Sequence, residues 1–129
     1  HATSTMPDLP SVSYEVFIML NWKEYRTWLM GKLGGFSKLS PDTMKGYQTL
    51  AKANGEGGVL DAKTRELIAM AVAVTTRCDG CITVHAEAAR KVGATEQELA
   101  EALGVAVAMN AGAAMVYSAR ALDAFNSGN

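Results

Sequence analysis

Two stretches of small and apolar residues, Leu67–Val74 and Leu103–Val116, constrain the fold of this chain more than any other feature. The first follows Asp61, a good helix N-cap, and is apolar on every face of the helix that it would form, so this helix must be buried all round. Together the two stretches are more apolar helix than a lone domain of 129 residues comfortably hides. We therefore predict a homo-oligomer whose subunits cover part of this surface.

Composition and capping signals indicate an all-α fold. The chain has seven Met, many Ala and only 7% aromatic residues, whereas a sheet would be richer in β-branched and aromatic residues. Caps, prolines and glycines divide the chain into helices. The expected helices are 22–33 (ended by Gly34-Gly35), 41–53, 62–76, one from the Cys78 stretch to a stop at Gly93, 96–109 after a capping box at Thr95, and 113–125 after a break at Asn110-Ala111-Gly112.

The length predicts one domain, because 129 residues can bury a hydrophobic core without stabilisation by disulfides or metal ions. We expect this domain to span residues 21–129, with its core in 61–125. Residues 1–20 form an N-terminal lead-in whose first six residues resemble the remains of an expression tag. His1 is therefore not counted among the candidate functional residues. The short apolar run Tyr14–Leu20 has no clear place in the fold.

Charge and hydropathy exclude several classes of protein. The net charge of −1 creates no field that would attract nucleic acid or an anionic membrane. No uninterrupted apolar run reaches the length of a membrane span, and the N-terminus lacks the basic and apolar regions of a signal peptide. We therefore expect a soluble, cytoplasmic protein with no nucleic-acid or membrane partner.

The eight residues from Cys78 to His85 hold both cysteines and the only histidine besides His1. On a helix, Cys78, Cys81 and His85 lie within about 60° of one another. Cysteines three apart can cycle between dithiol and disulfide, and a helix start favours the reactive thiolate. His85 is one turn after Cys81, so these two residues form a candidate nucleophile–base pair.

Glu66 is a further candidate at the start of the apolar helix. If this helix is central, the carboxylate is drawn inward and can orient a histidine in a proton relay, although a solvated Glu at a helix start is about as probable. Two other readings of the cluster remain open. One is a metal site with Cys78, Cys81, His85 and Glu66 as ligands, and the other is a redox-responsive oligomer without turnover.

The pattern of Glu66, eleven residues, Cys78-Asp79-Gly80-Cys81, three residues and His85 resembles the signature of the alkyl hydroperoxidase D branch of the carboxymuconolactone decarboxylase family. The resemblance covers about half of the chain, roughly 61–125. It implies an all-α helical bundle domain that assembles as trimers or hexamers. One departure is Gly80, since the best-studied pattern has a second histidine immediately before the second cysteine.

The resemblance also implies an activity, that of a thiol-dependent peroxidase. Cys81 would attack a hydroperoxide and become a sulfenic acid, and Cys78 would condense with it to a disulfide that an external dithiol reductant reduces. Glu66 and His85 would draw the proton from the thiol. The catalytic residues expected on this basis are Cys81, Cys78, His85 and Glu66, with no cofactor and no metal.

Overall fold

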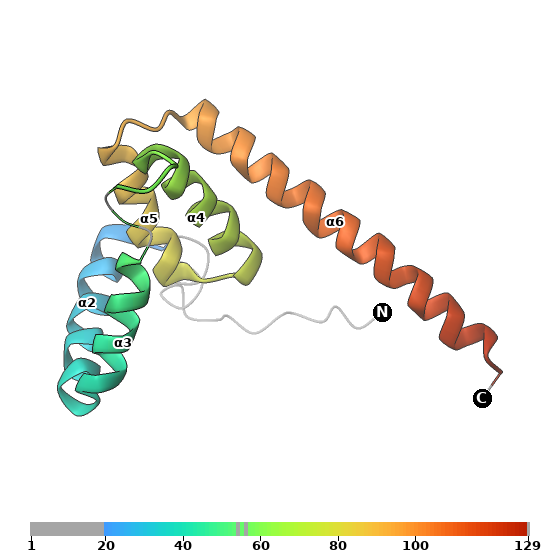
Figure 1. Ribbon diagram of the computed structural model, residues 1–129, viewed down its shortest axis with the longest axis horizontal. Coiled ribbons are helices and arrows are strands. Elements are labelled where there is room, and N and C mark those ends of the chain that lie inside the picture. Colours follow the sequence, from blue (N-terminus) through green and yellow to red (C-terminus); the bar gives the residue numbers. More distant parts are fainter. Residues whose placement is uncertain (1–19, 54, 56, 129) are drawn as a thin grey trace, which may run out of the picture.

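A computed structural model describes residues 20–53, 55 and 57–128, and all regular structure in this part of the chain is helical (Figure 1). The helices are α2 (Trp22–Leu39), α3 (Pro41–Lys52), α4 (Ala62–Thr76), α5 (Asp79–Lys91) and α6 (Glu96–Asn126). The predicted all-α class is therefore confirmed. The expected lead-in, with all of the Tyr14–Leu20 run except Leu20, lies outside the described residues.

Three predicted N-caps are confirmed. At each of them a side-chain oxygen accepts a hydrogen bond from the backbone N–H three residues on, which satisfies one of the free amides of the first turn. The pairs are Asn21 with Glu24, Asp61 with Thr64 and Thr95 with Glu98. At Thr95 the Glu98 side chain also accepts the Thr95 N–H, which completes the predicted capping box.

The predicted end of the first helix at Gly34-Gly35 is wrong, since α2 continues to Leu39. The helix ends there because Pro41 disfavours the helical conformation for Ser40, whose φ and ψ are −137° and 69°. Pro41 then opens α3, as predicted.

The predicted break at Asn110-Ala111-Gly112 is also wrong, because α6 is one continuous helix of 31 residues. Asn110 stays within the helix because its amide donates to the Ala106 carbonyl at 2.7 Å and to the Thr75 hydroxyl at 3.0 Å. The second contact holds α6 against the last turn of α4.

Helix α4 lies at the centre, between α5 and the first half of α6. Near its start, Lys63 Nζ lies 2.8 Å from Glu98 Oε2, and near its end Thr75 meets Asn110, so α4 and α6 run in the same direction. The Glu98 carboxylate raises the pKa of Lys63, and the Lys63 ammonium lowers the pKa of Glu98. Beyond Asn110, α4 has ended and α6 projects away from the other helices (Figure 1).

The core within one chain is small. Among the described residues, the buried apolar side chains are Met70, Ala73, Ala89 and Ala106, and Thr83 is the buried polar one. The expectation that the Leu67–Val74 helix is buried all round is not met within one chain, because Ile68 and Val72 are 49% and 55% exposed. Among the described helices of one subunit, only α5 and α6 contact α4, so these helices leave the outer face of α4 uncovered.

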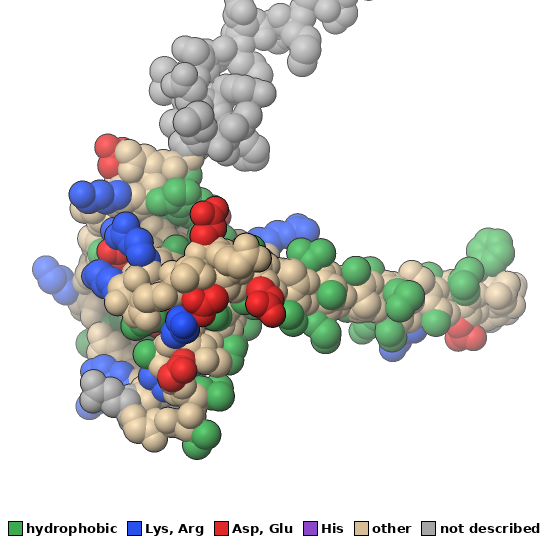
Figure 2. All heavy atoms as spheres, turned by 90° about the horizontal axis from the view of Figure 1, so that it is seen from above, with side chains coloured by type: hydrophobic (Ala, Val, Ile, Leu, Met, Phe, Trp, Pro, Cys, Tyr) green, Lys and Arg blue, Asp and Glu red, His purple; other side chains and the backbone are tan. Residues whose placement is uncertain are grey.

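The projecting part of α6 carries a row of exposed apolar side chains (Figure 2). They include Met115, Val116, Tyr117, Leu122 and Phe125. By length and composition alone, α6 is the one helix in the described part of the chain that could cross a membrane. This is weak evidence, because packed helices pass the same test.

Candidate redox site

The site begins at a tight joint between α4 and α5. Arg77 adopts a left-handed conformation, with φ 55° and ψ 48°, and its N–H donates to the Val74 carbonyl at 3.3 Å. The Cys78 N–H donates to the Ala73 carbonyl at 3.1 Å, which completes a Schellman motif at the end of α4. Cys78 is at the same time the N-cap of α5, so no flexible linker separates the two helices.

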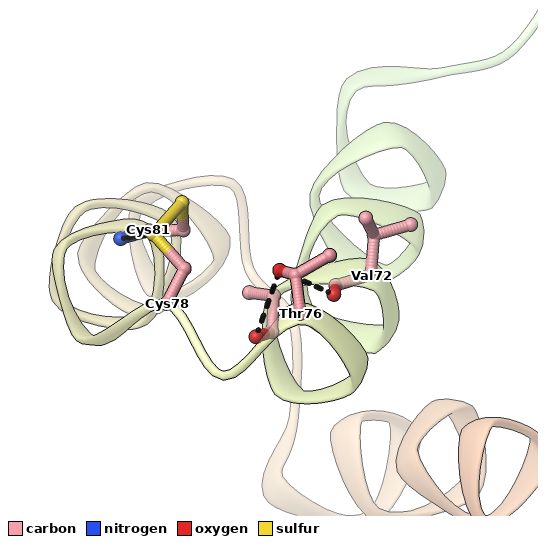
Figure 3. The surroundings of a disulfide bond; sticks show 5 residues. Val72, Thr76, Cys78 and Cys81 are labelled. Atoms are coloured by element: carbon pink, nitrogen blue, oxygen red, sulfur yellow. Dashed lines mark hydrogen bonds between the residues drawn. A yellow bond between two sulfur atoms is a disulfide. The ribbon is translucent and has the colours of Figure 1, made fainter. Parts of the chain in front are cut away.

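The two cysteines form a disulfide across the first turn of α5, with their Cα atoms 5.2 Å apart (Figure 3). The Cys81 backbone N–H donates to Cys78 Sγ at 3.1 Å, so a sulfur takes the place of the usual capping oxygen. This amide and the positive end of the α5 dipole both favour a negative charge on Cys78 once the disulfide is reduced. Both cysteine residues are partly exposed.

Glu66 on α4 and His85 on α5 meet directly. His85 Nδ1 lies 2.7 Å from Glu66 Oε2, and the two side chains are 37% and 23% exposed. An ionised carboxylate only accepts hydrogen bonds, so Nδ1 of His85 is the donor in this contact. His85 lies one helical turn after Cys81, on the same side of α5. The structure thus brings Glu66 and His85 together across the α4–α5 contact and joins Cys78 to Cys81 at the start of α5.

Helix α2 packs on the other side of α5. The Thr83 hydroxyl donates to the Trp22 carbonyl at 2.9 Å, and Arg26 lies 3.8 Å from the Glu87 carboxylate. Arg26 also donates to the Thr83 carbonyl at 3.4 Å. These contacts fix α2 beside the disulfide-bearing turn.

At Gly80, α2 and α5 approach each other closely. A Cβ added to Gly80 would lie 2.9 Å from Leu29 Cδ2 and 4.0 Å from the Tyr25 hydroxyl. Any side chain before Cys81 would therefore have to displace Leu29. Sequence reasoning missed this contact, because Leu29 and Gly80 are far apart in the chain and a lone glycine in a helix start gives no indication of its neighbour.

Three observations define a class of protein: a helical fold, a disulfide that caps a helix, and a Glu–His pair one turn away. They describe a helical protein with a disulfide at the start of one helix and a carboxylate–imidazole pair between that helix and its neighbour. Within the described residues, no group of three or more His, Cys, Asp or Glu side chains is placed to hold a metal ion.

Comparisons with known proteins identify the family. Residues 41–124 match the family model of the carboxymuconolactone decarboxylase family. The chain therefore belongs to this family, as its motif suggested. The family includes alkylhydroperoxidase-like members, and its members are often enzymes.

The chain is also similar to individual proteins, one of which is a named member of this family. An uncharacterised protein of Haemophilus influenzae is 55% identical over 106 residues, which cover 82% of this chain and 94% of the relative. The crystal structure of an apo carboxymuconolactone decarboxylase family protein from Legionella pneumophila matches with a TM-score of 0.66 and 42% identity, over 82% of this chain and 95% of that one. A structural genomics target from Methanobacterium thermoautotrophicum matches with a TM-score of 0.61 and 36% identity, over 66% and 96% of the two chains.

Proposed function

We propose that this protein is a thiol-dependent peroxidase that reduces hydroperoxides with the Cys78–Cys81 pair. The observation that carries the proposal is the 2.7 Å contact between His85 Nδ1 and Glu66 Oε2, one helical turn from Cys81. A base oriented by a carboxylate next to a thiol is the arrangement that activates a cysteine nucleophile.

The first step oxidises Cys81. The thiol proton passes to Nε2 of His85, while Glu66 stabilises the imidazolium that forms. The Cys81 thiolate attacks the terminal oxygen of ROOH, so that an S–O bond forms and the O–O bond breaks. The departing RO⁻ takes the proton from His85 and leaves as ROH, and Cys81 becomes a sulfenic acid.

The second step forms the disulfide. The Cys78 thiolate, stabilised by the Cys81 N–H, attacks the Cys81 sulfur and expels hydroxide, which leaves as water with the proton of Cys78. An external dithiol then reduces the disulfide by thiol–disulfide exchange and is itself oxidised. A reducing compartment keeps such a dithiol available, so we propose a cytoplasmic location.

The proposal is tested by mixing reduced protein with tert-butyl hydroperoxide and a dithiol donor and following loss of the peroxide. Wild-type protein should consume peroxide catalytically, and Cys81→Ser should not. Cys78→Ser should complete one turnover and stop at the sulfenic acid, which a dimedone adduct on Cys81 would reveal. Full activity in Cys81→Ser would refute the assignment.

We also propose that the protein works as a homo-oligomer, a trimer or a hexamer. The exposed apolar side chains of α4 and of the projecting α6 support this, since a monomer would leave a large apolar surface in water. Light scattering coupled to size exclusion measures the number of subunits.

A second candidate is a redox-responsive oligomer without turnover. The observation that favours it is the position of the disulfide at the α4–α5 joint, next to the exposed face of α4. It predicts different oligomeric masses for the oxidised and reduced protein and no peroxide consumption, whereas the peroxidase predicts consumption.

A further inference from the structure

We propose that Tyr25 of α2 donates a hydrogen bond to the oxygen that leaves when Cys81 is oxidised. This inference rests on the proposed peroxidase function and adds a residue that lies far from the Cys78–His85 cluster in the sequence. Tyr25 acts here on the substrate itself, opposite the Glu66–His85 pair.

The Tyr25 hydroxyl lies close to the disulfide-bearing turn. It is 4.0 Å from the position that a Cβ on Gly80 would take, and Gly80 directly precedes Cys81. The space that a side chain at position 80 would fill is thus lined by a phenolic O–H and by Leu29.

This hydroxyl has free hydrogen-bonding capacity. Among the described residues it makes no hydrogen bond, and the Tyr25 side chain is partly exposed. A donor that lies beside the disulfide-bearing turn and belongs to a partly exposed side chain is available to a bound substrate.

The Tyr25 ring has an aromatic neighbour on each side along α2. Its centroid lies 5.9 Å from that of Trp28, on which it stacks, and 6.5 Å from that of Trp22, which it meets edge to face. The Trp22 backbone carbonyl accepts a hydrogen bond from the Thr83 hydroxyl, which ties this turn of α2 to α5. These neighbours restrict the positions of the Tyr25 hydroxyl, and a donor held in place loses little entropy when charge develops beside it.

The chemistry calls for such a donor. As the Cys81 thiolate forms its bond to the terminal oxygen, the electron pair of the O–O bond moves onto the other oxygen. His85 supplies the proton that converts RO⁻ to ROH. Tyr25 keeps its own proton and stabilises the negative charge on this oxygen in the transition state.

The test compares two oxidants whose leaving groups differ in basicity. Tert-butyl hydroperoxide releases a strongly basic alkoxide, which needs a donor, whereas peracetic acid releases the weakly basic acetate. We expect Tyr25→Phe to slow Cys81 oxidation by tert-butyl hydroperoxide by roughly 10- to 100-fold, and oxidation by peracetic acid by less than about threefold. Tyr25→His, which restores a donor, should recover part of the lost rate.

Tyr47→Phe is the matched control, because Tyr47 is an exposed tyrosine on α3. It should leave both rates unchanged. Equal losses with both oxidants in Tyr25→Phe, or no loss with either, would overturn the role of Tyr25 while leaving the peroxidase proposal intact. A wild-type protein that reduces neither oxidant would overturn the peroxidase proposal and this inference with it.

Discussion

Replacing Glu66 with glutamine removes the charge beside His85 while keeping an oxygen that can accept the Nδ1 proton. The contact is 2.7 Å long in the wild type, and the shape of the side chain barely changes. Glu66→Gln therefore isolates the electrostatic part of the relay. The transition state for thiol deprotonation places a positive charge on the imidazole, and this is the charge that Glu66 stabilises.

The size of the effect follows from the contact and its exposure. A hydrogen bond to a charged group contributes about 1.5–3 kcal/mol. The side chains of His85 and Glu66 are 37% and 23% exposed, so solvent screening favours the lower end, about 1.5 kcal/mol. Each 1.4 kcal/mol is a factor of ten in rate, so Glu66→Gln should slow Cys81 oxidation about tenfold.

The assay is the second-order rate of thiol loss when reduced protein is mixed with tert-butyl hydroperoxide by stopped flow. Glu101→Gln is the matched control, because Glu101 is an exposed carboxylate on α6. A Glu66→Gln rate within twofold of the wild type would show that the carboxylate does not assist the reaction. A Glu66→Gln rate equal to that of Glu101→Gln would lead to the same conclusion.

Three further predictions concern the helices that position the site. Asp61→Ala should lower the melting temperature by a few degrees, since Asp61 caps α4. The Thr64 amide holds the pKa of Asp61 below its ordinary value of 3.8, so this contribution is complete above that pH and is lost as the pH falls below it. The difference between the two proteins in thermal melts should shrink in acid. Arg77→Gly should raise the melting temperature by a few degrees, because a left-handed conformation strains any residue with a Cβ, and a lower value would mean that the arginine side chain makes a stabilising contact. If α6 joins subunits, Leu122→Asp with Phe125→Asp should reduce the mass measured by light scattering, and an unchanged mass would exclude the end of α6 from the interface.

Local signals in the sequence predicted the helix starts because capping depends on a few adjacent residues. Asn21, Asp61 and Thr95 each form the expected bond. Helix ends were harder to predict. Gly34-Gly35 costs helix stability without forcing an end, and Pro41 was the stronger signal that the preceding helix must stop.

Contacts between distant segments account for the other differences. Asn110 favours a break in isolation, but its bond to Thr75 on α4 keeps α6 straight. The Glu66–His85 contact was one of two equal readings of Glu66, because the sequence alone does not say which way the carboxylate turns. Tyr25 and Leu29 reach Gly80 only through the packing of α2 on α5, for which the sequence offered no pattern.

The joint at Arg77 and Cys78 constrains the number of residues that can lie between Glu66 and the cysteines. One residue inserted there would break either the Cys78–Ala73 bond or the cap on α5, and so would disturb the position of His85 relative to Glu66. The interval of eleven residues between Glu66 and Cys78 is thus one that this joint tolerates little change in. Insertions engineered into this protein belong in the α3–α4 loop.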